Sequence, residues 1–250
     1  MGKMSKNTIA IVTGGASGIG FAIAEKFVEN GITTIIVGRN ENKLKAAKDR
    51  LGKRCVSLSF DLDNLSGIPK LVDQIIGKHQ RIDILVNNAG INLKKEFTEV
   101  TDDDFQRIMH TNVSAMFSLS REVIKCMLEK GSGSVINISS MASQYGLPKV
   151  IAYSASKAAI EGMTRAMAVE LSPKGIRVNC IAPGFIATDM SAKALNNDKE
   201  RKAKVMSRTP MGAMGMPADI GDAAVFLASE ASKYITGVVL PVDGGNSIGF

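Results

Sequence analysis

The chain has few of the residues that stabilise small secreted domains or bind metals. It contains three cysteines, two histidines and no tryptophan in 250 residues. Cys55, Cys126 and Cys180 are odd in number, widely spaced and embedded in apolar runs, as is typical of buried thiols in a reducing compartment. Neither His79 nor His110 lies near a cysteine, whereas zinc ligands usually come in tight local pairs. We therefore expect no disulfide framework and no bound metal.

Long apolar runs are also missing. No run approaches the roughly 18 residues that a membrane-spanning helix needs, and residues 1–8 are polar and lack the apolar core of a signal peptide. From these absences we expect a cytoplasmic protein with no membrane partner. The composition, 45% hydrophobic and 22% charged, is that of a globular protein. Its length suits one α/β domain spanning residues 1–250.

Positive charge is in modest excess. Lysine and arginine number 31 against 24 aspartates and glutamates, a formal charge of +7, so an anionic ligand or a nucleic acid has to be considered. The basic residues are scattered, and their densest run, from Lys43 to Arg54, has the spacing of a solvated helix face. Few aromatic residues accompany it, which argues against a stacking platform for single strands. We expect no nucleic-acid partner.

Apolar runs and helical patterns alternate along the chain. The patterns predict strands at 9–13, 33–37, 56–60, 82–86, 135–138, 177–181 and 238–242, and helices at 19–30, 41–51, 68–76, 102–130 and 152–171. Such alternation implies right-handed crossovers and a parallel sheet with helices on both faces. The predicted fold is α/β, a single-domain Rossmann-type doubly wound sheet of about seven strands. Ligands of such sheets bind beyond the carboxyl ends of the strands.

A glycine-rich turn follows the first predicted strand and leads directly into a helix. Its glycines, Gly14, Gly18 and Gly20, would let a pyrophosphate approach the backbone at the helix N-terminus, with Ser17 and Ile19 between them. The glycine spacing is four and then two, unlike the G-x-G-x-x-G fingerprint. An ordinary strand-to-helix turn is therefore the alternative to a cofactor loop.

The end of the second predicted strand bears on the choice of cofactor. In NAD sites an acidic residue near this position binds the ribose 2′-hydroxyl, whereas an arginine accommodates a 2′-phosphate. No acidic residue occurs between Val37 and Asn40, but Arg39 does. We therefore expect NADP(H) to be favoured over NAD(H), with a plain surface arginine as the alternative. After the third strand, Asp61 is a candidate acceptor for the adenine amine, or else a helix N-cap.

Tyr153 and Lys157 are the clearest candidates for catalysis. Their spacing of four places both side chains on one face of a predicted helix. Lowering the pKa of a tyrosine from about 10 to about 7 requires about 4 kcal/mol. One unit charge at about 4 Å supplies about 4 kcal/mol at an effective dielectric near 20, before desolvation of the phenol takes some back. Tyr153 is therefore a candidate acid and base near neutral pH, with an ordinary surface pair as the alternative.

Three further polar residues have plausible places near this pair. Ser139 and Ser140 end the fifth predicted strand, where a hydroxyl can hydrogen-bond a substrate oxygen as charge develops. Asn112 lies in the middle of a predicted helix, where a buried polar group needs a partner. An asparagine there can hold a water or a backbone carbonyl in a proton path.

These residues together resemble the short-chain dehydrogenase/reductase family over nearly the whole chain. The family's catalytic serine lies thirteen residues before its tyrosine, which selects Ser140 over Ser139. The resemblance implies that Tyr153 donates a proton to a ketone, and that Lys157 lowers the pKa of Tyr153 and binds the nicotinamide ribose. It implies that Ser140 polarises the carbonyl and that Asn112 supports a water-linked proton relay. The cofactor-binding residues expected overall are Gly14, Ser17, Gly18, Ile19, Gly20, Arg39, Asn40, Asp61, Leu62, Asn88, Ala89, Gly90, Thr111, Tyr153, Lys157, Pro183, Gly184, Ile186 and Thr188.

The resemblance also bears on substrate and assembly. Residues 182–190 and 234–237 resemble 3-oxoacyl-[acyl-carrier-protein] reductases, although many of these carry an arginine in place of Ser17 and a basic residue in place of Gly131 or Ser132. Residues 38–40 and 89–92 resemble sugar-acid dehydrogenases of the gluconate 5-dehydrogenase type. The substrate is expected to be a 3-oxoacyl thioester or a keto-sugar acid, covered by residues 190–211. Family members are commonly homotetramers.

Two other functional classes are compatible with parts of the sequence. A non-catalytic dinucleotide-binding or scaffold protein would keep the glycine turn without needing Ser140, Tyr153 and Lys157 together. A serine hydrolase is suggested by the Ser-x-x-Lys of residues 154–157, but the Ser-Asp-Asn and Lys-Thr-Gly motifs that would complete such a site do not occur. An oxidoreductase accounts for more of the residues than either alternative.

Overall fold

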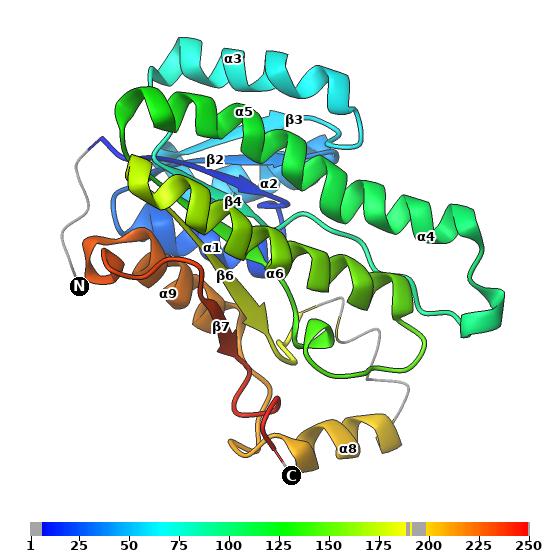
Figure 1. Cartoon of the computed structure of the whole chain (residues 1–250). Coiled ribbons are helices and arrows are strands. Elements are labelled where there is room, and N and C mark those ends of the chain that lie inside the picture. The colour runs from blue at the N-terminus through cyan, green and yellow to red at the C-terminus, as the bar shows by residue number, and fades with distance from the viewer. Residues whose placement is uncertain (1–6, 189–190, 192–198, 250) are drawn as a thin grey trace.

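The computed structural model of the chain describes residues 7–188, 191 and 199–249 and has the predicted α/β architecture (Figure 1). The strands in these residues form one sheet, made of β1 (Ile9–Thr13), β2 (Thr33–Gly38), β3 (Cys55–Ser59), β4 (Ile84–Asn87), β5 (Gly133–Ile138), β6 (Ile176–Pro183) and β7 (Val239–Val242). Their order is β3-β2-β1-β4-β5-β6-β7, and all neighbouring pairs are parallel. The prediction of a parallel sheet of about seven strands is confirmed.

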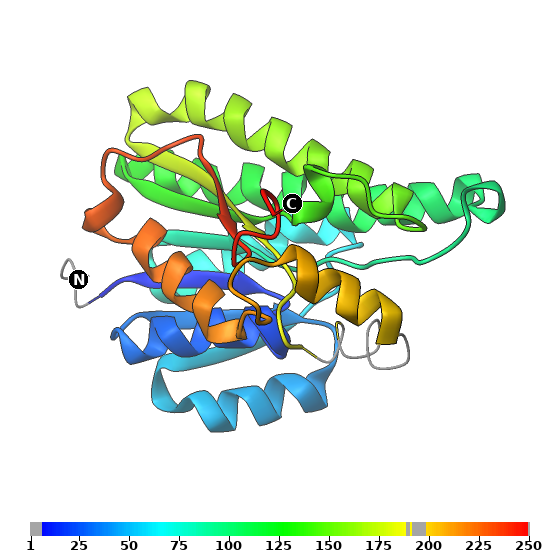
Figure 2. The same cartoon turned by 90° about the horizontal axis from the view of Figure 1, so that it is seen from below.

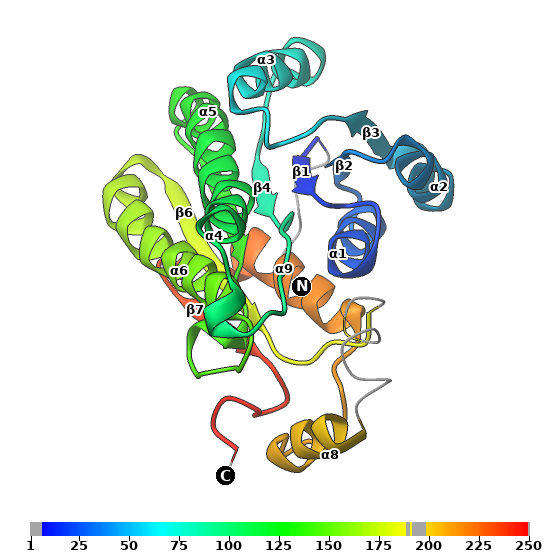
Figure 3. The same ribbon diagram turned by 90° about the vertical axis from the view of Figure 1, so that its right-hand side faces the viewer.

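Helices cover both faces of the sheet, which explains why the central strands read as continuous apolar runs. All five residues of β1 are buried. Ala10 and Val12 pack on one side of the sheet, and Ile9 and Ile11 pack on the other. One face is covered by α1 (Gly18–Glu29), α2 (Glu41–Leu51) and α9 (Pro217–Ala228), and the other by α3 (Ile68–His79), α5 (Ala115–Lys130) and α6 (Ile151–Leu171) (Figure 3).

The segment 102–130 is helical, as predicted, but it is not one uniform helix. A π-helical turn at His110–Ser114 separates α4 (Asp102–Met109) from α5. Such a turn inserts one extra residue into the helix. Here it carries Asn112, whose side chain hydrogen-bonds residues of two other segments, Ile91 and Ser156. Apolar periodicity does not reveal this turn because its polar contacts are made far along the chain.

Two helices near the C-terminal end were not predicted. The first, α8 (Lys199–Arg208), lies in the segment 190–211 that was expected to cover the substrate; residues 190 and 192–198 lie outside the described residues. It runs beside the C-terminal segment (Figure 2), where Arg208 Nε donates a hydrogen bond to the Asn246 carbonyl at 3.1 Å. The second, α9, begins at Pro217, a residue suited to a first helical turn.

The sheet has a topological switch point between β1 and β4. The chain passes from β1 outward to β2 and β3, and then returns to place β4 on the other side of β1. Loops leaving these two strands run to opposite faces, so the carboxyl ends of the strands are the expected place for a ligand.

No helix in the described part of the chain has the length and apolarity to cross a membrane. Among the same residues, no cluster of histidine, cysteine, aspartate and glutamate side chains is suited to hold a metal ion.

Candidate active site

A cavity of about 770 Å³ opens at the carboxyl ends of the strands, where a doubly wound sheet binds its ligands. Loops that follow β1, β4, β5 and β6 form its walls together with the first turns of α6. The predicted residues that line it are Gly14, Ser17, Gly18, Ile19, Gly20, Asn88, Ala89, Gly90, Ser140, Tyr153, Lys157, Pro183, Gly184, Ile186 and Thr188. Residues far apart in the sequence therefore meet in one site.

The glycine turn leaves no room for side chains at two positions. A Cβ atom on Gly20 would lie 2.3 Å from the Gly14 carbonyl oxygen, and one on Gly14 would lie 2.9 Å from the Asn88 amide nitrogen. Gly14 also has a φ of +65°, which favours glycine. The Ser17 hydroxyl makes no capping bond to α1, so this hydroxyl and the first N–H groups of the helix remain available to an anion. The turn therefore fits a dinucleotide pyrophosphate.

Hydrogen bonds tie this turn to the loop after β4. The Thr13 hydroxyl oxygen accepts from the backbone N–H groups of Asn88 at 2.9 Å and Ala89 at 3.0 Å. In return, the Asn88 side chain donates to the Thr13 carbonyl at 2.9 Å. These bonds hold the two loops together across the switch point, so the small residues predicted at positions 88–90 form the floor of the cavity.

Lys157 is the only lysine lining the cavity among the described residues, and it is almost completely buried, with 4% of its surface exposed. Its ammonium group donates to the Ile138 carbonyl at 2.8 Å and lies 5.5 Å from the centre of the Tyr153 ring. Burial lowers the pKa of Lys157 to about 8, because an apolar environment disfavours the charged form. The predicted pairing of these two side chains on one helix face is confirmed as a contact.

The pKa of Tyr153 moves in the opposite direction to that expected. Burial of the phenol raises the pKa, and a hydrogen bond with the Ser140 side chain lowers it only in part. The physical reason is that desolvation penalises the phenolate, while the Lys157 ammonium is directed at the Ile138 carbonyl. The expectation that Lys157 brings the Tyr153 pKa down is therefore not met by these side chains alone.

The geometry separates the two serines that end β5. Ser139 is buried, and its hydroxyl donates to Glu161 Oε1 at 2.7 Å. The Ser140 hydroxyl accepts from the Ala142 N–H at 3.2 Å and hydrogen-bonds Tyr153. The choice of Ser140 as the serine of the site agrees with this arrangement.

Asn112 is buried, with 1% of its surface exposed, and both polar atoms of its side chain have partners. Its oxygen accepts from the Ile91 N–H at 2.8 Å, and its nitrogen donates to the Ile91 carbonyl at 2.9 Å and to the Ser156 hydroxyl at 3.0 Å. A Cβ atom on Gly90 would lie 3.1 Å from the Asn112 oxygen and 3.7 Å from the Lys157 ammonium. Asn112 therefore fixes the loop after β4 beside Lys157 but does not itself line the cavity.

Five predicted cofactor residues lie away from the cavity lining. Arg39 is exposed and pairs with Asp61 at 3.8 Å and Asp63 at 4.0 Å. Asn40 caps α2 by accepting from the Lys43 N–H at 2.9 Å. Asp61 is not a helix N-cap, because its carboxylate accepts from the Asp63 N–H in a turn. The other two are Leu62, which packs beside α3, and Thr111, which lies in the π-helical turn.

Several lining residues were not predicted from the sequence. Leu147 and Val150 precede α6, and Phe185 follows Gly184, so apolar side chains flank the segments that carry Tyr153 and Gly184. Arg50 belongs to the basic run interpreted as a solvated helix face; it is exposed, but its guanidinium lies 4.3 Å above the Phe21 ring at the edge of the cavity. The sequence signal for Leu147, Val150 and Phe185 is their proximity to motif residues, and Arg50 has no such signal.

A glycine turn at the switch point and a serine–tyrosine–lysine cluster in the same cavity define a dinucleotide-binding oxidoreductase. Known proteins agree with this class. The family described as Enoyl-(Acyl carrier protein) reductase matches residues 14–247. A 3alpha-hydroxysteroid dehydrogenase of Mediterraneibacter gnavus is 39% identical over 250 residues, covering 98% of each chain. A 3-oxoacyl-[acyl-carrier-protein] reductase of Chlamydia trachomatis is 40% identical, covering 98% of this chain and 99% of the other.

Solved structures give the same result. A candidate gluconate dehydrogenase of Agrobacterium tumefaciens superposes with a TM-score of 0.94 at 34% identity, covering 97% of each chain. A candidate gluconate 5-dehydrogenase of Beutenbergia cavernae, with bound NADP, superposes with a TM-score of 0.89 at 38% identity, covering 95% of this chain and 96% of the other. The chain therefore belongs to the short-chain dehydrogenase/reductase family of oxidoreductases, which bind a nicotinamide dinucleotide.

Proposed function

We propose that this enzyme transfers hydride reversibly between NADP(H) and a ketone or secondary alcohol, with Tyr153 as the acid and base. The observation that carries the proposal is the meeting of Ser140, Tyr153 and Lys157 in the cavity that the glycine turn also lines. The turn and Ser17 would hold the pyrophosphate, and Lys157 would hold the nicotinamide ribose. When bound, the cofactor supplies a hydride for the carbonyl carbon and, once oxidised, a positive charge that favours the phenolate.

The residues of the chain then have separate tasks in reduction. The Ser140 hydroxyl donates to the substrate oxygen as negative charge develops on it, and the Tyr153 hydroxyl gives that oxygen its proton. Lys157, buried beside the phenol, stabilises the phenolate that is left. Asn112 holds Ile91 and Ser156 in place, which orders the route by which Tyr153 regains a proton. In the direction of oxidation the same proton transfers run backwards.

Two substrate classes are candidates, and the structure favours one. Leu147, Val150 and Phe185 put apolar surface in the cavity. Two cations, Lys157 and Arg50, belong to its described lining, and Lys157 is the one that contacts the Tyr153 ring. This lining suits the acyl chain of a 3-oxoacyl thioester, the class that the relative from Chlamydia trachomatis is named for. A keto-sugar acid is the second candidate because of the likeness to the two gluconate dehydrogenase structures.

The central test replaces Tyr153 by phenylalanine, which removes only the hydroxyl. We expect Tyr153→Phe to lower kcat at least about 1000-fold, since it loses the proton donor rather than one supporting hydrogen bond. NADPH binding, followed by fluorescence titration, should change less than about twofold, because the glycine turn is untouched. Turnover at the wild-type rate in this variant would show that Tyr153 is not the acid.

A matched screen of NADPH oxidation distinguishes the substrates. Acetoacetyl-coenzyme A, 5-ketogluconate and a 3-ketosteroid are offered to the wild-type enzyme, the steroid because one relative is named as a hydroxysteroid dehydrogenase. We expect the highest kcat/KM for the thioester. A higher value for the sugar acid would replace the first candidate by the second.

A further inference from the structure

A buried carboxylate lies beneath the site and has no part in the proton transfers described above. Glu161, in the middle of α6, has 8% of its surface exposed. No cation among the described residues forms a salt bridge with it. Its Oε1 atom instead accepts hydrogen bonds from two hydroxyl groups, those of Ser139 at 2.7 Å and Ser143. Burying an acid without a cation is unfavourable unless such donors are present, so this arrangement calls for an explanation.

The two hydroxyls that Glu161 binds flank Ser140 on both sides. The Ser139 N–H donates to the Ile181 carbonyl of β6 at 2.8 Å, and the Ser143 N–H donates to the Ser140 carbonyl at 3.0 Å. Between them, the Ala142 N–H donates to the Ser140 hydroxyl at 3.2 Å. Ser140 therefore lies within a tight turn whose two ends are attached to one carboxylate.

Among the described residues, no other acceptor outside the turn receives hydrogen bonds from both of its ends. The remaining acceptors near the Ser139 hydroxyl are the Ser143 hydroxyl oxygen at 3.2 Å and the carbonyl oxygens of Ser140 and Lys157, each at 3.4 Å. The two carbonyl contacts are long for a hydroxyl donor. Without Glu161, the Ser143 hydroxyl keeps the Ser140 carbonyl at 2.5 Å as an acceptor. The turn would then be closed on itself, and the long contact from the Ser139 hydroxyl to the Lys157 carbonyl would be its remaining side-chain link to α6.

Glu161 also belongs to the helix that carries the other reacting groups. Tyr153, Lys157 and Glu161 follow one another at intervals of four on α6, so their side chains lie along the same face. Attaching the Ser140 turn to this face fixes the serine relative to the tyrosine. We propose that Glu161 is a positioning residue for Ser140. The proposal rests on the function proposed above, because it assigns Ser140 to the reaction.

The test is a double-mutant cycle between Glu161 and Ser140. Turnover is measured with NADPH and acetoacetyl-coenzyme A, or with 5-ketogluconate or the 3-ketosteroid if the screen shows faster reduction of one of these. Glu161→Leu removes the acceptor at similar volume, and we expect it to lower kcat about 10- to 100-fold, part of the loss that removing an oxyanion donor brings. In a Ser140→Ala background the same change should alter kcat less than about twofold, since no hydroxyl remains to be positioned.

Two variants control the experiment. Glu161→Gln keeps an oxygen acceptor and should retain kcat within about threefold, although its hydrogen bonds are neutral and weaker. Glu170→Leu changes an exposed glutamate of the same helix and should leave kcat unchanged. NADPH affinity by fluorescence titration should stay within about twofold in every variant, which separates serine positioning from a general distortion of the site.

The outcomes separate this proposal from the function on which it rests. Equal losses from Glu161→Leu in the wild-type and Ser140→Ala backgrounds would overturn the positioning role, as would unchanged kcat in the wild-type background. If Ser140→Ala alone turns over at the wild-type rate, the proposed function fails instead. If thermal melting shows that Glu161→Leu is not folded, Ser143→Ala replaces it in the double-mutant cycle. For Ser143→Ala we expect kcat to fall about 3- to 10-fold. An unchanged kcat in this variant overturns the proposal.

Discussion

Lys157 is a charged side chain buried in the interior of the protein beside the Tyr153 ring. Its pKa of about 8 means that, below pH 8, the folded chain holds an ammonium that the unfolded chain would expose to water. From the pKa difference, this arrangement costs about 3 kcal/mol of stability at pH 7. Such a cost is tolerated where a charge is needed for function.

Replacing this lysine should therefore stabilise the protein while inactivating it. Lys157→Met removes the buried charge and loses the hydrogen bond to Ile138, which is worth about 1 kcal/mol, so we expect a net gain of about 1–2 kcal/mol at pH 7. The gain should shrink as pH rises from 8 to 10.5, because the folded wild-type lysine is then neutral. Urea unfolding at pH 7 and pH 10 measures this difference. A variant less stable than wild type at pH 7 contradicts the prediction.

Arg39 offers a second test at the level of single residues. Its contacts with Asp61 and Asp63 are long and exposed, and such pairs are worth at most about 1 kcal/mol, so the guanidinium is free to turn to a 2′-phosphate. Asp63→Asn removes a competing carboxylate and should tighten NADPH binding about three- to fivefold, with less effect on NADH. Arg39→Ala should weaken NADPH alone. Equal binding of NADH and NADPH by the wild-type enzyme would refute the preference for NADP(H).

Single residues could be predicted where their spacing along the chain carries the information. Tyr153 and Lys157 were identified because four residues make one helical turn, and Ser140 because of its distance from Tyr153. Glu161 follows the same interval but gave no signal, since its partners Ser139 and Ser143 come from another element. The carboxylates beside Arg39 were also unforeseen, because that contact exists only once the loops after β2 and β3 lie side by side.

Strands were predicted best where helices cover both faces of the sheet. Strands such as β1, with all five residues buried, must be apolar throughout, so their positions agree with the sequence pattern to within a few residues. The π-helical turn around Asn112 and the helix α8 were not predicted. The first depends on hydrogen bonds to Ile91 and Ser156, and the second is mostly polar outside the core, where a local pattern gives little guidance.

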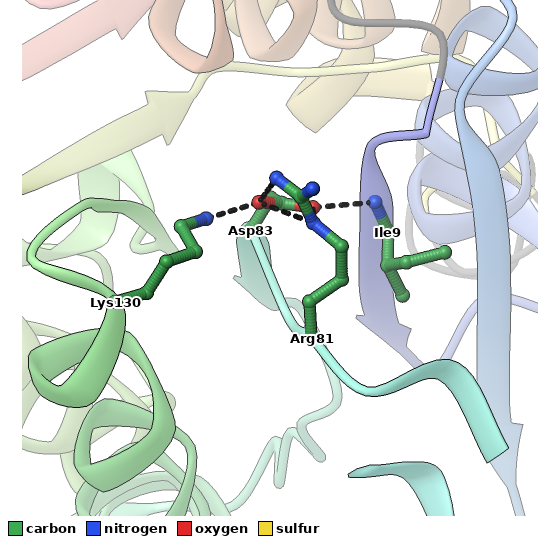
Figure 4. A network of polar contacts seen from close by, with 4 residues as sticks. All are labelled: Ile9, Arg81, Asp83 and Lys130. Atoms are coloured by element: carbon green, nitrogen blue, oxygen red, sulfur yellow. Dashed lines mark hydrogen bonds and ion pairs between the residues drawn. The ribbon is translucent and has the colours of Figure 1, made fainter.

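The opposite end of the sheet is joined by a charged cluster, seen in Figure 4. Asp83, just before β4, accepts hydrogen bonds from the Ile9 N–H at 2.8 Å and from Arg81 at 2.7 and 2.9 Å, and it also pairs with Lys130 at the end of α5. Burial by itself raises the pKa of Asp83, but these hydrogen bonds outweigh it and hold the pKa below its usual value. One carboxylate thus connects β1, β4 and α5.

Removing the charge of Asp83 should destabilise the connection between these elements. We expect Asp83→Asn to lose about 1–3 kcal/mol of unfolding free energy at pH 7, because Arg81 and Lys130 are left without their acceptor. Since the folded pKa is depressed, the contribution of Asp83 is present above its unfolded pKa near 4 and is lost as pH falls through the folded value. The unfolding free energies of the two proteins, measured by denaturant titration, should therefore approach each other progressively as pH falls below 4. A constant difference down to pH 2 would contradict this account.

At the level of the whole molecule, apolar side chains on α5 bear on assembly. Phe117 is 48% exposed and Leu128 is 37% exposed, and both lie on the face of α5 that carries Arg121, whose guanidinium is 5.6 Å from the Phe117 ring. These two side chains lie about three turns apart on the helix, and both would be buried if a second copy of the chain packed along this face. We propose that this face is an interface of the homotetramer expected from the family resemblance.

We therefore predict that wild-type protein elutes as four chains of 26.5 kDa in size-exclusion chromatography with light scattering. Phe117→Asp places a charge where a second chain would bury an aromatic ring, and should shift the protein to dimers or monomers. Lys45→Asp, on the solvated face of α2, is the charge-matched control and should leave the mass unchanged. Monomeric wild-type protein would rule out the tetramer. If Phe117→Asp remains a tetramer, the contacts between subunits lie on a part of the surface that does not include this face of α5.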